Sequence, residues 1–203
     1  MASFLAQVED IVGALPTSAD LDDFLTTTAK EIIDIIPPAL LLSYVQAVTS
    51  VADDNGQAIE GTKILSVSRA GYPAKEVPYA MSAQVIDSAS LHMATAMSPV
   101  FYRLGKDAFI KPAPDGSNAG QFLLYTYEAF AYTESMSHHL SFPDNCEPAL
   151  IYGSCIKVLQ QKLNVTLHTD EDTEIIAAMQ VELATITKSY ETQIMILTGG
   201  QKK

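Results

Sequence analysis

Residues 170–195 read DEDTEIIAAMQVELATITKSYETQIM, and this stretch decides the class of fold. Apolar side chains recur along it every three or four residues, which predicts one amphipathic helix with Thr169 as its cap. The apolar stripe consists of Ile175, Ile176, Met179, Leu183, Ile186, Tyr190 and Ile194. At about 1.5 Å per residue the helix would be roughly 39 Å long. Such a helix needs a second surface to cover its stripe, either another long helix of the chain or a neighbouring subunit.

Three more helices are predicted from capping residues and apolar periodicity. One begins at Asp144 or Asn145 and precedes the long helix. The other two lie at the start of the chain: the first runs from a cap at Ser3 to Pro16, and the second from a cap at Thr17 to Pro37-Pro38. Residues 39–51 are apolar enough for a core, but their pattern does not distinguish helix from strand.

The middle of the chain has the pattern of short strands. Residues 62–69 (TKILSVSR) alternate between the two faces of a sheet, and a reversal after them leads to a partner strand around residues 75–77. Gly105-Lys106 joins two further strands, 99–104 and 107–111, in a tight hairpin. Residues 121–127 (QFLLYTY) form another strand, and a short helix begins at Pro78.

These elements predict an α+β fold: a helical bundle made by the N- and C-terminal helices, with a small β-rich insertion. Residues 1–61 would hold the N-terminal helices and residues 62–130 the insertion. Residues 131–203 would hold the C-terminal helices, which pack with residues 1–61 as one bundle.

Composition narrows the classes of function. The 203 residues are 48% hydrophobic and carry a net charge of −12, which opposes binding to nucleic acid phosphates or anionic lipid. Residues 1–60 hold ten acids against one base, Lys30. The sequence has no apolar run long enough to span a bilayer and no basic signal-peptide region at its start, so we expect a soluble protein made in a cytoplasm.

The motifs of nucleotide-binding loops and of serine hydrolases do not occur in the sequence. The most suggestive constellation is Cys146 at a helix start, where the dipole would lower its pKa, with His138, His139 and Asp144 nearby. The alternative is an unreactive cysteine beside a polar loop. Residues 170–172 could bind a divalent cation, but acids at a helix start also stabilise the helix dipole. We expect no catalytic residue, metal or cofactor.

Three stretches and the final helix resemble the head-to-tail adaptor proteins of tailed bacteriophages, also called connector or tail tubular adaptor proteins. The stretches are residues 64–69 (ILSVSR), residues 88–112 with the hairpin Tyr102-Arg103-Leu104-Gly105, and residues 142–156 (FPDNCEPALIYGSCI). The resemblance covers about residues 60–195 and brings no catalytic residues with it.

The resemblance implies a structural virion protein of the neck, assembled in the host cytoplasm. It would form a homo-oligomeric ring of twelve copies below the portal protein, extend the DNA channel and dock the next tail component. A ring of negatively charged subunits lets duplex DNA pass without specific binding. Neither a membrane nor an enzymatic activity is expected.

Three groups of residues receive roles in this interpretation. The subunit interface would be the helix face of Ile176, Met179, Leu183, Ile186 and Tyr190, and the tail-facing hairpin would present Tyr102, Arg103 and Lys106. Asp53, Asp54 and Glu60 are candidates for the channel lining, although a solvated outer face explains them equally well.

Two other functions stay open. One is another neck or tail component, such as a tail terminator or completion protein, which would differ in ring symmetry. The other belongs to a different class, a small cytoplasmic enzyme that uses Cys146.

Overall fold

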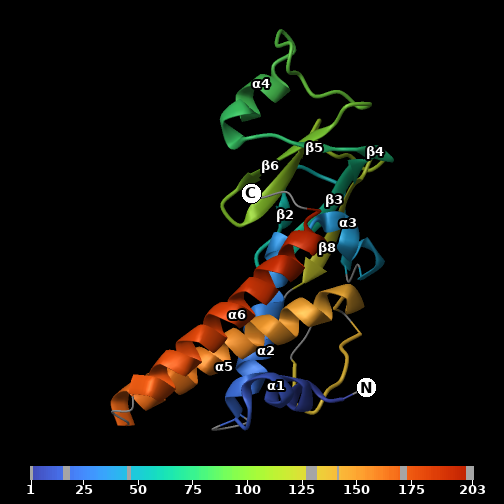
Figure 1. The fold of residues 1–203 in the computed structure, drawn as a ribbon. Helices are drawn as coiled ribbons and strands as arrows, with labels where there is room; N and C mark the ends of the chain where they lie inside the picture. The colour runs from blue at the N-terminus through green and yellow to red at the C-terminus, as the bar shows by residue number, and fades with distance from the viewer. Residues whose placement is uncertain are drawn as a thin grey trace. The chain divides into compact units, whose positions relative to one another are not determined.

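A computed structural model shows how the chain folds (Figure 1). It describes residues 2–15, 19–44, 47–126, 132–140, 142–169 and 173–199. Helices and strands both contribute, so the fold is α+β, as the sequence predicts. The chain divides into two compact units, a helical unit of Met1–Pro37 with Ala129–Lys203 and a β-rich unit of Pro38–Glu128.

The helical unit contains four main helices: α1 (Phe4–Val12), α2 (Ala19–Ile35), α5 (Glu147–Thr169) and α6 (Thr173–Leu197). The Ser3 hydroxyl accepts a hydrogen bond from the Ala6 N–H at 3.2 Å, which confirms the predicted cap of α1. This helix ends at Val12, earlier than the predicted Pro16, because Gly13 turns the backbone away with a φ of 70°. The predicted cap Thr17 lies outside the described residues.

The centre of the helical unit is α5, which packs against α1, α2 and α6. A short 3-10 turn, η4 (Asp144–Cys146), leads into α5. Figure 1 shows α6 running alongside α5 over most of its length. The buried side chains include Phe4, Val8, Leu21, Leu25, Ile32, Ile33, Leu150, Val158 and Leu159. The predicted helices therefore bury their apolar stripes against one another.

The β-rich unit begins at Pro38, earlier than the predicted residue 62. The undecided stretch 39–51 contains both structures, since α3 (Pro38–Leu41) and the 3-10 turn η1 (Leu42–Tyr44) precede strand β1. The strands are β1 (Ala47–Val51), β2 (Gln57–Ala58), β3 (Thr62–Arg69), β4 (Tyr72–Pro73), β5 (Lys75–Glu76), β6 (Val100–Leu104), β7 (Asp107–Lys111) and β8 (Gly120–Thr126). Between β5 and β6 lie the 3-10 turn η2 (Tyr79–Met81) and helix α4 (Ser82–Ile86), where the sequence predicted a short helix.

The strands form two four-stranded sheets, in the orders β1-β8-β3-β4 and β2-β7-β6-β5. Strands β6 and β7 pair from Val100↔Lys111 to Leu104↔Asp107, which confirms the predicted hairpin around Gly105. Strand β8 pairs antiparallel with both β1 and β3. Side chains from both sheets share one hydrophobic core: Ile64, Val67, Phe101, Ala108, Ile110, Phe122 and Leu124.

The prediction that residues 75–77 pair with the strand over residues 62–69 is wrong. Ala70 and Gly71 adopt positive φ values of 50° and 83° and close a tight turn, so β4 pairs with the end of β3. The chain then crosses to the other sheet, where Lys75 and Glu76 pair in parallel with β6. The sequence identified a reversal but not the sheet that receives the following strand.

Among the described residues, no helix has both the length and the apolar character needed to cross a membrane.

Candidate functional site

Cys146 does not have the environment of a nucleophile. It lies in η4, fully buried, and burial raises the pKa of its thiol to about 12. The predicted lowering by the helix dipole is therefore wrong, because loss of hydration penalises the thiolate more strongly. At neutral pH the group is a protonated thiol, whose sulfur lies 3.6 Å from the Asn145 side-chain oxygen.

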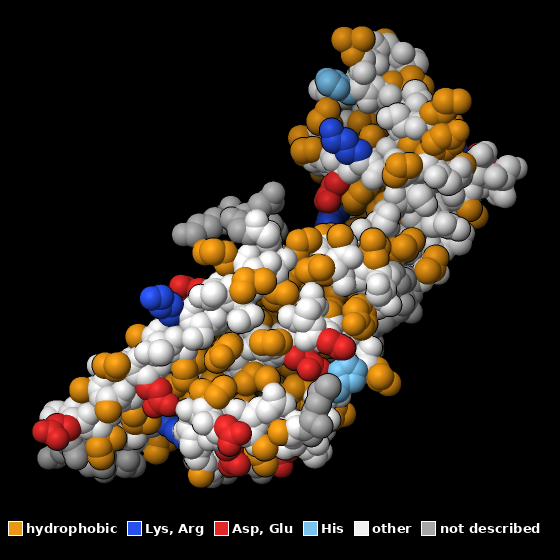
Figure 2. Space-filling model, turned by 45° about the vertical axis from the view of Figure 1, so that its right-hand side comes forward, with side chains coloured by type: hydrophobic (Ala, Val, Ile, Leu, Met, Phe, Trp, Pro, Cys, Tyr) orange, Lys and Arg blue, Asp and Glu red, His pale blue; other side chains and the backbone are white. Residues whose placement is uncertain are grey.

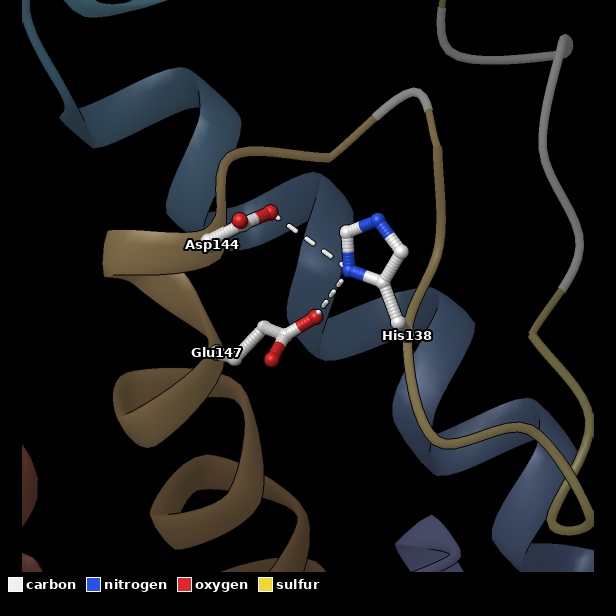
Figure 3. A group of neighbouring side chains, drawn as sticks. All are labelled: His138, Asp144 and Glu147. Atoms are coloured by element: carbon white, nitrogen blue, oxygen red, sulfur yellow. Dashed lines mark hydrogen bonds and ion pairs between the residues drawn. The ribbon is translucent and has the colours of Figure 1, made fainter. Parts of the chain in front are cut away.

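The two neighbouring histidines make other contacts. The Nδ1 atom of His138 lies 2.8 Å from Oε1 of Glu147 and 3.4 Å from Oδ1 of Asp144, as Figure 3 shows. The ring of His139 packs against Tyr132, with 4.9 Å between the ring centroids. Burial, and secondarily the charge of His138, lower the pKa of His139. His138 thus contacts two carboxylates, and the ring of His139 contacts the ring of Tyr132.

Of the three residues predicted to face the tail on the β6–β7 hairpin, one lies in the core and two lie on the surface. Tyr102 is only 7% exposed and stacks on Phe109 with 5.6 Å between ring centroids, so it is not available to a partner. Arg103 lies on the surface with its Nε 2.9 Å from the Glu76 carboxylate. Lys106 is also exposed and lies 2.5 Å from the Glu60 carboxylate. The two charged residues of this predicted set are therefore held in ion pairs, beside Leu104, which is 44% exposed.

The three acids proposed for the channel lining are all exposed, but their charges have local partners. Asp53 closes a turn by accepting hydrogen bonds from the backbone and side-chain nitrogens of Asn55, at 3.1 and 2.6 Å. Both oxygens of Asp54 lie within 2.7 Å of the Lys111 ammonium. Glu60 pairs with Lys106. Ion pairing of two of these acids weakens the negative field that they would present to DNA.

The predicted interface stripe of α6 faces α5 of the same chain. Ile186 is buried, and Ile176, Met179, Leu183 and Tyr190 are half-buried. Thr166 of α5 donates a weak hydrogen bond to the Met179 sulfur at 3.9 Å. Helix α5 therefore supplies a second surface for the long helix within the chain, and it leaves four of the five predicted interface residues partly exposed.

Beyond these five residues, α5 and α6 carry exposed large hydrophobic side chains, which we call collectively the hairpin apolar surface: Val165, Leu167, Ile175, Val181, Met195 and Ile196. They are distributed along and around the two helices, since Val165 and Leu167 alone are about 200° apart on α5. Their exposed fractions run from 46% for Ile175 to 68% for Val181. Figure 2 shows hydrophobic side chains among polar ones along this part of the molecule. The sequence stripe missed Val181 and Ile196 because they lie off the face that packs on α5.

A second exposed apolar surface lies in the β-rich unit, on the segment between β5 and β6. Its members are Tyr79, Ile86, Leu91, Met93 and Met97, and Leu91 is fully exposed. Asp87 is the one Asp, Glu, Lys or Arg residue between Val77 and Pro99. Figure 2 shows hydrophobic side chains gathered over the end of the β-rich unit that carries α4. Large exposed apolar patches mark contacts with proteins or membranes, or ligand-binding grooves.

No family model matches this sequence, and no curated protein matches it. The surfaces and contacts above are therefore the basis for assigning a function.

Proposed function

We propose that this chain is a structural protein of the virion neck, a head-to-tail adaptor of a tailed bacteriophage. It would form a ring below the portal, extend the DNA channel and dock the tail. The resemblance of residues 64–69, 88–112 and 142–156 to such adaptors suggests the family. In this proposal the helices of both chain ends form one bundle, and the β-rich segment is an insertion that contacts the next tail component.

The observation that carries the proposal is the hairpin apolar surface. Helix α6 packs mainly on α5, and within the described part of the chain Val181 and Ile196 stay 68% and 66% exposed. Full burial of one aliphatic side chain contributes about 1.5–3 kcal/mol. When each copy covers this surface of the next copy, the contact is heterologous, and a rotation that closes gives a ring.

Charge supports the same proposal. A chain with a net charge of −12 does not attract DNA phosphates, and a ring of such chains repels a duplex that passes through it. Lys106 and Lys111 lie beside acids, so the β-rich unit does not present them as an open phosphate-binding patch.

The proposal is tested by assembly of the full chain with two matched variants. Val181→Glu places a charge on the hairpin apolar surface, where Val181 is 68% exposed. Val48→Glu is the control, because Val48 is 62% exposed on β1, outside the proposed subunit contact. Neither change buries a charge in the free chain, so the unassembled chains of both variants should unfold at the temperature of the unassembled wild type.

Native mass spectrometry, with and without portal rings, measures the outcome. We expect wild-type and Val48→Glu chains in complexes of about twelve copies, and Val181→Glu chains as monomers. A Val181→Glu chain that assembles like the wild type would refute this contact. Absence of the chain from purified virions would refute the adaptor role, and a ring of sixfold symmetry would identify a tail terminator instead.

A further inference from the structure

Three side chains with metal-binding atoms meet at the start of α5. They are His138 from the preceding loop, Asp144 from η4 and Glu147 from the first turn of α5. Their ligand atoms, one from each residue, all lie within 4.8 Å of one another. Figure 3 shows the Nδ1 side of the imidazole turned toward both carboxylates.

The distances from the imidazole to the two carboxylates are close to those that a single cation requires. A zinc-like ion binds nitrogen and oxygen ligands at about 2.0–2.2 Å, which places neighbouring ligands roughly 3 to 3.5 Å apart. The distances from His138 Nδ1 are 2.8 Å to Glu147 and 3.4 Å to Asp144. Small side-chain rotations would therefore convert the present side-chain contacts into metal ligation.

Helix geometry and backbone hydrogen bonds fix the positions of the three residues. Asp144 and Glu147 are three residues apart at a helix start, which places them on the same side. The loop that carries His138 is bonded to α1, since Met136 O accepts the Phe4 N–H at 2.7 Å. After His138, the Phe142 N–H donates to His139 O at 3.0 Å, and Phe142 is fully buried. These bonds restrict where the imidazole can lie.

The exposed fractions of the three side chains differ, which would leave a bound ion open to solvent on one side. The Glu147 side chain is 16% exposed and the His138 side chain 35%, whereas the Asp144 side chain is 74% exposed. The two more buried groups provide a dry side. On the open side water can complete the coordination, as it does in sites with three protein ligands.

We propose that His138 Nδ1 and the carboxylates of Asp144 and Glu147 bind one divalent transition-metal ion of the zinc type. Imidazole and carboxylate together suit zinc, whereas magnesium and calcium prefer oxygen ligands alone. Nδ1 must bind through its lone pair, so the imidazole proton resides on Nε2, or a proton is released when the ion binds. The ion joins the loop before α5 to the start of that helix and stabilises the helical unit. This site does not depend on the adaptor function.

The test is calorimetric titration of zinc into the full chain, without an affinity tag and after removal of metals with a chelator. We expect one ion per chain. His138→Gln, Asp144→Asn and Glu147→Gln should each weaken binding by at least about tenfold. We expect Asp144→Asn to fold like the wild type, because the Asp144 side chain is 74% exposed. In a melting experiment zinc should raise the unfolding temperature of the wild type and not that of Asp144→Asn.

Two histidine variants serve as controls. His92→Gln changes an exposed histidine of the β-rich unit, and His139→Gln changes the neighbour that packs on Tyr132. Both should bind zinc like the wild type. The proposal is overturned if the wild type binds no zinc up to about 1 mM. It is equally overturned if His138→Gln keeps wild-type affinity, or if binding is lost in His92→Gln or His139→Gln.

Discussion

Gly153 lies where α5 packs against Thr28 of α2 and Tyr190 of α6. A Cβ atom added there would lie 2.4 Å from Cγ2 of Thr28 and 3.1 Å from the ring of Tyr190. Carbon atoms in contact are normally about 3.5–4.0 Å apart. Thr28 is fully buried on α2, so displacing its Cγ2 disturbs the packing around it. One methyl group at this position must therefore displace the Thr28 side chain or separate the packed helices.

Two effects of opposite sign determine how Gly153→Ala changes the free energy of unfolding. In an exposed helix interior alanine would stabilise by about 1 kcal/mol over glycine. At Gly153 the added methyl group overpacks the core, which lowers the free energy of unfolding by about 1–3 kcal/mol. Its contact with Thr28 Cγ2 would be more than about 1 Å too short, so we expect a value at the upper end of this range. We expect the free energy of unfolding to fall by a net amount of about 2 kcal/mol.

Urea unfolding followed by circular dichroism measures this free energy, and a second substitution tests its cause. Thr28→Ser removes Cγ2 and keeps the hydroxyl, so the double variant should recover about 1–2 kcal/mol relative to the sum of the single changes. Gly116→Ala is the control, because nothing lies within 4 Å of its added Cβ. A stabilised Gly153→Ala chain, or strictly additive effects with Thr28→Ser, would refute the packing argument.

Three further predictions concern charge and titration. Asp54→Asn should lower the free energy of unfolding by about 1–3 kcal/mol, because the nearly buried Lys111 ammonium loses its charged partner, whereas Asp53→Asn should have little effect in the same urea assay. The thiols of Cys146 and Cys155, both buried with pKa raised to about 12, should react with a thiol reagent only after unfolding, as absorbance before and after denaturant will show. The backbone N–H groups of Ser117 and Asn118 donate hydrogen bonds to the Asp115 carboxylate and lower its pKa. The contribution of Asp115 to the free energy of unfolding is therefore present above the pKa of the unfolded chain and is lost as pH falls through the lower pKa of the folded chain. NMR titration of the carboxyl group measures the folded pKa.

A specific result would contradict each of these three predictions. Equal effects of Asp54→Asn and Asp53→Asn would show that the Lys111 pair contributes nothing particular. Rapid reaction of either thiol in the native chain would contradict its burial. An Asp115 pKa at or above the ordinary value for aspartate would contradict the role of the two backbone donors.

The sequence by itself determined the elements whose signal is local. Alternation over Thr62–Arg69 predicts β3 with the bounds that the structure has, and the turn at Gly105 predicts the β6–β7 hairpin. The spacing of apolar residues predicts the long helix α6. In each case neighbours in the chain supply the cause: side chains alternate in a strand, repeat every 3.6 residues in a helix, and a glycine permits the tight turn.

Tertiary structure decided what each of these elements packs against. Periodicity shows that one face of α6 is apolar, but only the packed chain shows that the stripe around Ile186 contacts α5 and that Val181 faces outward. The pairing of β5 with β6, and the burial of Tyr102 within the hairpin, also depend on residues distant in sequence.

The candidate metal site shows the same division. His138, Asp144 and Glu147 are close in sequence, but the sequence emphasised Cys146 between them, because a helix start can activate a thiol. Folding buries that thiol and turns His138 toward the carboxylates. Local pattern fixes which backbone conformation a segment prefers, whereas hydration and pKa depend on which groups the whole chain brings around each side chain.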